Sequence, residues 1–166
     1  MRKMITFMIA LLVVGMLLGC ERNAIQDDDN VIDSELIITE KVLPEDFYEI
    51  ADQGMLVKKV TNQEDFIAQW EYYGLTESHV EIDWDNKIAI FLGIFESGSC
   101  PFTFNYAALS EENTELLIHI ETDSEGPCTD DATPRTMVVV VDADQLSDVN
   151  HIEIINYYGS NSRTEF

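Results

Sequence analysis

The sequence predicts a mainly β domain of the α+β class, an antiparallel β-sheet or sandwich with one packed helix. Three observations support this prediction. Short apolar segments follow one another through turns, a pattern typical of antiparallel strands. Only the stretch from 61 to 74 has apolar residues at clear helical spacing. The 166 residues are 46% hydrophobic, which is ample for one core.

The first part of the domain contains two predicted strands and the helix. Residues 36–41 and 55–60 favour short strands, and 44–51 favours a helical turn or a loop. The helix is expected to start at a capping box made by Thr61 and Glu64. Its apolar face and its stop follow in order: Phe66, Ile67, Trp70, Tyr73 and Gly74. We expect Trp70 to pack in the core rather than to stack on a ligand.

The second part contains the strongest strand patterns. Residues 80–83 alternate apolar and acidic side chains before a turn at Asp85 and Asn86. Residues 87–95 and 136–141 are almost continuously apolar, as expected of strands that are buried on both faces. Three further segments have strand patterns: 102–107, 116–122 and 151–157. A long polar loop is expected at 123–134 and a short helical turn at 144–147.

The first 19 residues have the three parts of a secretory signal peptide. Arg2 and Lys3 supply the positive charge, and 5–18 supply an apolar stretch shorter than the roughly 20 residues of a permanent membrane span. Leu17, Leu18, Gly19 and Cys20 resemble the lipobox of bacterial lipoproteins. That resemblance implies cleavage before Cys20 and a diacylglycerol on its thiol. An uncleaved N-terminal anchor or a plain signal peptide is the alternative.

Domain boundaries follow from composition. Residues 20–35 are polar and acidic and are expected to form a flexible tether that extends by self-repulsion. The single globular β-rich domain is placed at 36–158, and 159–166 is expected to be a frayed polar tail.

The formal net charge of the chain limits the classes of molecule that it could bind. The full chain has a formal net charge of −23, and removal of 1–19 takes away two basic and no acidic residues, which leaves −25. Nucleic acid is excluded as a partner, since its binding needs basic side chains against phosphates. A solvated acidic surface is the simplest explanation, and a basic partner or a divalent cation is the alternative.

Three cysteines divide into one lipid-bearing residue and one pair. With Cys20 lipidated, Cys100 and Cys128 remain, and an oxidising compartment favours a disulfide between them. The bridge would stabilise the fold by roughly 3–4 kcal/mol in the chain-entropy account. A catalytic thiol is the alternative, but neither cysteine lies in a CxxC motif or beside a histidine.

The disulfide brings two polar loops together, and their residues form the candidate binding surface. These residues are Ser97, Ser99, Thr129, Asp130, Asp131 and Arg135. Arg135 is expected to form a local salt bridge with the neighbouring acids. The alternative is that the disulfide only stabilises the loops at this end of the domain and that these loops bind nothing.

Other chemistry finds weaker support in the sequence. Asp123, Glu125, Asp130 and Asp131 surround Cys128 and could bind calcium, although they lack the regular spacing of a calcium loop. The three histidines, His79, His119 and His151, share no zinc-type spacing. Ser97–Ser99 is not a GxSxG nucleophile motif. We therefore expect no metal, no cofactor and no catalytic residue.

The order of these patterns resembles that of the PrcB C-terminal-like domain over residues 57–156. The resemblance includes Phe66 and Trp70 on the helix, the 80–83 alternation, Gly93 within 88–95, Ser97-Gly98-Ser99, and Pro134 before 136–141. Where that family often has Thr-Gly-Gly-Tyr, this chain has Ser97-Gly98-Ser99-Cys100. The resemblance implies a non-catalytic domain of bacterial exported proteins, one of which stabilises or binds a protease. It transfers no functional residues.

Together these patterns predict a lipid-anchored protein on the extracytoplasmic face of the cell membrane. Its expected role is that of a non-catalytic module which binds a protein, such as another envelope protein, or a ligand. The membrane is contacted through the lipid on Cys20. An envelope hydrolase and a calcium-dependent adhesion module are the alternative functions.

Overall fold

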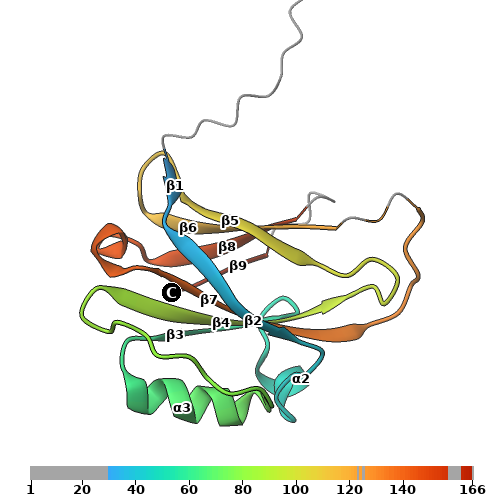
Figure 1. Cartoon of the computed structure of the whole chain (residues 1–166). Coiled ribbons are helices and arrows are strands. Elements are labelled where there is room, and N and C mark those ends of the chain that lie inside the picture. Colours follow the sequence, from blue (N-terminus) through green and yellow to red (C-terminus); the bar gives the residue numbers. More distant parts are fainter. Residues whose placement is uncertain (1–29, 123, 125, 157–161, 166) are drawn as a thin grey trace, which may run out of the picture.

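The computed structural model describes residues 30–122, 124, 126–156 and 162–165. Within these residues the chain forms two stacked β-sheets, and helices cover the outer face of one of them (Figure 1). The predicted β-sandwich with a packed helix is therefore confirmed. The signal peptide, Cys20 and most of the predicted tether lie outside the described residues.

The first sheet has five strands and the second has four. Sheet A has the order β1-β5-β6-β8-β9, and sheet B has the order β2-β7-β4-β3. The strands of sheet A are β1 (Val31–Ile32), β5 (Thr103–Leu109), β6 (Glu115–Glu121), β8 (His151–Asn156) and β9 (Ser162–Glu165). Those of sheet B are β2 (Ser34–Glu40), β3 (Met55–Val60), β4 (Lys87–Glu96) and β7 (Thr133–Asp142).

Strands β4 and β7 form the centre of the fold. They pair antiparallel over ten residues each, from Lys87 opposite Asp142 to Glu96 opposite Thr133. Alternate residues such as Ile90 and Val139 face sheet A. The residues between them face the helical layer on the other side of sheet B. Burial on both faces explains why these two segments are almost continuously apolar, as the sequence predicted.

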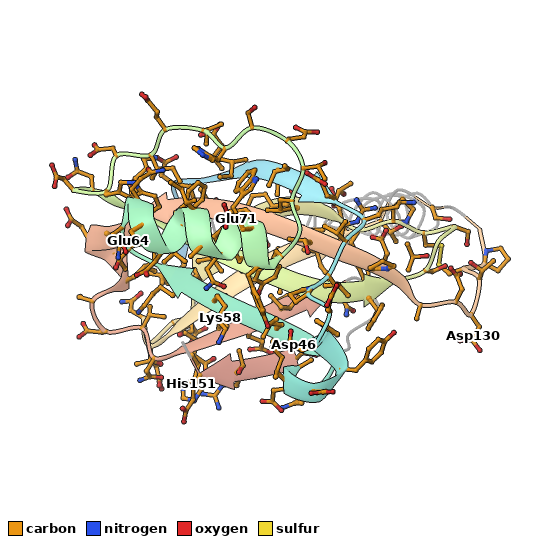
Figure 2. The ribbon with its side chains drawn as sticks, turned by 90° about the horizontal axis from the view of Figure 1, so that it is seen from below. Asp46, Lys58, Glu64, Glu71, Asp130 and His151 are labelled. Atoms are coloured by element: carbon orange, nitrogen blue, oxygen red, sulfur yellow. A yellow bond between two sulfur atoms is a disulfide. The ribbon has the colours of Figure 1, made fainter. Side chains whose placement is uncertain are left out.

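The outer face of sheet B is covered by α3 (Gln63–Tyr72) and by the short α2 (Phe47–Ile50). Phe66 and Trp70 of α3 pack against Phe91 of β4, with ring centroids 5.5 and 6.4 Å away. Figure 2 shows α3 lying across this sheet, beside the strand that carries Lys58. The expectation that Trp70 belongs to the core is confirmed, since only 5% of its surface is exposed.

The start of α3 differs from the predicted capping box. Asn62 is the N-cap residue, and its side-chain oxygen accepts a hydrogen bond from the backbone N–H of Asp65 at 2.9 Å. The box predicted at Thr61 and Glu64 is thus displaced by one residue. Asn and Thr are both favoured N-cap residues, so the sequence alone does not distinguish Thr61 from Asn62 as the start of the helix. The helix ends before Gly74, which has a φ of +72°.

Several strand boundaries differ from those expected. β1 and the start of β2 lie inside the predicted tether of 20–35, and β9 lies inside the tail of 159–166, where fraying was expected. Both β1 and β9 are short edge strands that pair with β5 and β8, and Ile32 of β1 is also buried in the core between the sheets. β7 begins at Thr133, within the predicted loop.

Two further differences concern pairing. β6 and β8 run parallel, because β7 crosses to sheet B between them, so the sheets are mainly and not wholly antiparallel. The alternating segment 80–83 forms no strand. It packs beside sheet B instead, where Ile82 contacts the apolar cluster between the sheet and α3.

The two sides of the sandwich are closed differently. On one side β1 of sheet A continues into β2 of sheet B with only Asp33 between them, so the chain itself joins the two edges. On the other side the edges are β3 and β9, and the side-chain amide of Gln53 donates to the backbone carbonyl of Arg163 across them at 3.3 Å. We call this second side, where the edges β3 and β9 face each other, the β3–β9 seam.

Gly93 is required where α2 and α3 meet β4. A Cβ atom at this position would lie 2.8 Å from Leu43 and 3.3 Å from the rings of Phe47 and Tyr73. We expect Gly93→Ala to lower the free energy of unfolding in urea by about 1–3 kcal/mol, because the buried rings must move. Gly126→Ala is the control, since a Cβ there meets nothing within 4 Å. Equal effects of the two substitutions would contradict this packing.

Candidate functional site

A disulfide joins the two loops at one end of the sandwich. Cys100 follows β4, Cys128 precedes β7, and their Cα atoms lie 5.5 Å apart. The predicted pairing is confirmed. Because Ser97 also bridges back to Cys100 in the turn, the loop after β4 is fixed at both ends. The loop that carries Thr129 to Ala132 is fixed against it.

Three hydroxyl groups of the candidate surface lie together beside the disulfide. The oxygens of Ser97, Ser99 and Thr129 lie 3.0–3.2 Å from one another. The backbone N–H of Thr129 also donates to the Ser99 hydroxyl at 2.9 Å. The cluster therefore joins the two loops by hydrogen bonds as well as by the disulfide.

Asp131 anchors this cluster to the backbone. Its carboxylate accepts hydrogen bonds from the Thr129 hydroxyl, from the Thr133 hydroxyl at 2.9 Å, and from the backbone N–H of Gly98 at 3.1 Å. The hydroxyls of Thr129 and Thr133 are the main cause of the lowered pKa of this carboxyl group. A Cβ at Gly98 would lie 2.6 Å from an Asp131 oxygen, so a larger residue here would displace the Asp131 carboxylate from its hydrogen bonds.

The other two residues of the predicted surface lie elsewhere. Asp130 is exposed at the tip of the loop, far from the end of the molecule that carries His151 (Figure 2). Arg135 is 8% exposed and lies at the inner face of sheet B. Arg135 was expected to form a local salt bridge with the loop acids, but of the acids that the structure describes, neither Asp130 nor Asp131 pairs with it.

Arg135 is paired instead with Glu96, for which the sequence pattern predicts no role. The two guanidinium contacts to the Glu96 carboxylate measure 2.5 and 3.0 Å, and the glutamate side chain is fully buried. In the β4–β7 ladder Ile94 opposes Arg135 and Glu96 opposes Thr133. Glu96 and Arg135 are therefore diagonal neighbours on one face. Strand register, which the sequence did not give, was needed to find this pair.

The ion pair also ties three strands together. Glu96 accepts a hydrogen bond from the backbone N–H of Phe102, just before β5, at 2.7 Å. Arg135 donates to the Thr39 hydroxyl of β2 at 3.1 Å. The buried charges are thus compensated by each other and by hydrogen bonds, which is the condition for burying them without a large loss of stability.

An apolar cavity of about 360 Å³ lies between the sheets at the seam between β3 and β9. Its walls come from both sheets: Met55 and Ile94 from sheet B, and Phe102, Ile120 and Ile154 from sheet A and its entry. Gln53, Asn156 and Ser162 add polar groups.

A shallower hollow of about 260 Å³ adjoins this cavity at the disulfide, lined by Cys100, Cys128 and Asp131. Phe95 and Phe102 line both spaces. The two spaces are therefore neighbours, and the hollow reaches Ser97 and Asp131 at the hydroxyl cluster. The cavity could not be predicted from the sequence, because its walls come from strands of both sheets whose arrangement depends on the sheet order.

The alternatives based on metal or histidine chemistry find no cluster in the described residues. Among these residues no three of the His, Cys, Asp and Glu side chains gather to hold a metal ion. Asp123 and Glu125, part of the predicted calcium loop, lie outside the described residues. His119 stacks on Tyr106 with ring centroids 4.2 Å apart, and its burial lowers its pKa. His79 packs against Phe66 and Trp70.

Comparison with protein-family models, curated proteins and solved structures finds no match for this chain. The lipobox and the resemblance to the PrcB C-terminal-like domain therefore stay predictions. Among the described helices, none has the length and apolar character needed to cross a membrane.

Removal of Arg135 tests the buried ion pair. Arg135→Met would leave the Glu96 carboxylate buried and unpaired, so we expect the free energy of unfolding in urea at neutral pH to fall by about 3–5 kcal/mol. Lys87→Met is the matched control. Lys87 pairs with Asp33 and Asp142 at 3.3 and 3.6 Å at the surface, where such a pair contributes about 0–1 kcal/mol. An equal loss in the two variants would refute the role given to the ion pair.

Proposed function

We propose that this protein is a lipid-anchored, extracytoplasmic binding module that holds an apolar group of its ligand between its two sheets. The cavity at the β3–β9 seam is the observation that carries the proposal. Its volume of about 360 Å³ lies near the lower end of the roughly 300–1,000 Å³ typical of ligand sites. The site therefore suits a small apolar molecule or the apolar part of a larger one.

The surroundings of the cavity would determine the orientation of the bound ligand. Apolar side chains of both sheets would enclose the buried group, and transfer from water would supply about 25 cal/mol per Å² of apolar surface. The adjoining hollow ends at the carboxylate of Asp131 and at the hydroxyl cluster. A polar or cationic end of the ligand would lie there, where it meets fixed hydrogen-bonding groups. This complementarity requires no catalytic step.

The location follows from the N-terminal sequence. A chain cleaved before Cys20 and lipidated on its thiol would be held at the membrane, while the net charge of −25 keeps the folded domain off an anionic surface. An oxidising compartment agrees with the disulfide between Cys100 and Cys128.

The lipid anchor is tested by expression of the full-length chain in a bacterium fed with labelled palmitate. We expect the wild-type protein to incorporate the label and to fractionate with membranes. Its intact mass should equal the chain from Cys20 plus a diacylglycerol. Cys20→Ala should lose both the label and membrane association, whereas Cys128→Ala should keep them. Label in Cys20→Ala would argue against the proposed attachment site.

The cavity is tested with the neutral fluorescent probe N-phenyl-1-naphthylamine and the mature chain. We expect saturable fluorescence enhancement, and Ser162→Phe should weaken it by about tenfold or more, because the new ring fills the space beside Ile154. Glu165→Phe adds the same ring to an exposed position of the same strand and is the control. Equal probe binding by both variants, or none by the wild type, would rule out this cavity as the site.

A further inference from the structure

The segment 80–83 has a strand pattern but no strand partner among the described residues. Val80 and Ile82 alternate with Glu81 and Asp83, and 42% of the Val80 side chain is exposed. The chain between α3 and β4 runs back beside α3, on the side of sheet B where β2 lies (Figure 2). A strand-forming sequence is thus held alongside the sheet without joining it.

The edge of sheet B that faces this segment is β2. In the described part of the chain, β2 pairs with β7 on one side and with no strand on the other. Alternate N–H and C=O groups of such an edge point away from the sheet and can accept another strand. The register shift between Leu36 and Ile38 twists this edge locally, a common means of limiting unwanted pairing.

A groove of about 360 Å³ separates β2 from the 80–83 segment. Its apolar lining comes from Leu36, Ile37, Val80, Ile82 and Val140. Its charged lining is mainly acidic: Glu35, Glu81 and Asp83. Lys87 also lines the groove, but its ammonium group is paired with Asp33 and Asp142. The groove therefore combines apolar side chains, negative charge and an open backbone edge.

The far wall of the groove is held in place at both ends. At one end Glu40, the last residue of β2, accepts hydrogen bonds from the backbone N–H groups of Thr76 and Glu77 at 2.9 and 3.2 Å. At the other end the carbonyl of Asp83 accepts from the backbone N–H of Lys87 at 2.8 Å. Ile82 is packed against the core. These contacts keep the wall apart from β2 and keep the groove open.

We propose that this groove binds an extended peptide segment with alternating basic and apolar residues, which adds to sheet B as a strand beside β2. Backbone hydrogen bonds to β2 supply affinity, and the apolar and acidic linings select the side chains. A basic segment fits the groove better than a second copy of this chain does, because this chain has a formal net charge of −23 and two copies repel each other. The inference is independent of the cavity, since β2 and β3 are opposite edges of sheet B.

A labelled ten-residue peptide of alternating lysine and valine tests this site on the mature chain. Fluorescence anisotropy should show saturable binding that weakens with salt, and hydrogen exchange should slow at β2 amides but not at those of β3. The same peptide with glutamate in place of lysine should not bind. A peptide with alternate backbone amides methylated on its pairing edge should not bind either. Equal binding of the methylated peptide would overturn strand addition and leave charge attraction alone.

Variants of the groove locate the binding. Glu35→Gln combined with Glu81→Gln should weaken peptide affinity roughly tenfold, as expected for the loss of two exposed charge contacts. The control combines Glu111→Gln with Glu112→Gln, which removes two exposed charges from the turn between β5 and β6. Equal weakening by both pairs, or no binding by wild type at low salt, would overturn the site. Probe binding in the β3–β9 cavity should be unchanged in both double variants.

Discussion

The structure depends on the burial of β4 and β7 on both faces. A strand pair with apolar side chains on each side must be covered twice, and here sheet A covers one face while α3 and α2 cover the other. The three layers follow from that requirement. The remaining strands serve as cover and as edges. This central pair also holds Glu96 and Arg135 at its end, which links the core directly to the disulfide-tied loops.

The two candidate binding regions lie on opposite sides of the sandwich, because the two sides are closed in different ways. Where β1 continues into β2, the sheets are joined by the chain, and the free side of β2 faces a groove rather than the core. Where β3 and β9 meet, a hydrogen bond from Gln53 to Arg163 crosses between the edges, and an apolar cavity lies between the sheets. The ion pair and the disulfide fix the end of the sandwich next to that cavity.

Much of the fold could be predicted from the sequence, because its strongest signals come from burial. The apolar runs 87–95 and 136–141 and the helical face of Phe66 and Trp70 report how many sides of each element are covered. Strand β9 could not be predicted, since it pairs with β8 through its backbone and has no apolar pattern. Strand β1 could not be predicted because its two residues, Val31 and Ile32, are too few to show a strand pattern, although Ile32 is buried in the core.

Only part of the candidate site could be predicted from the sequence. Cysteine count was sufficient to pair Cys100 with Cys128 and to bring Ser97 and Thr129 together. To identify the true partner of Arg135, the register of β4 against β7 had to be known, and this register depends on contacts between distant segments.

To test the central role of the β4–β7 pair, we would measure amide hydrogen exchange across the mature chain at increasing urea concentrations. We expect β4 and β7 amides to exchange only through global unfolding, while β9 opens locally at a much lower free-energy cost. Exchange of β4 and β7 amides as fast as that of β9 would contradict this central role.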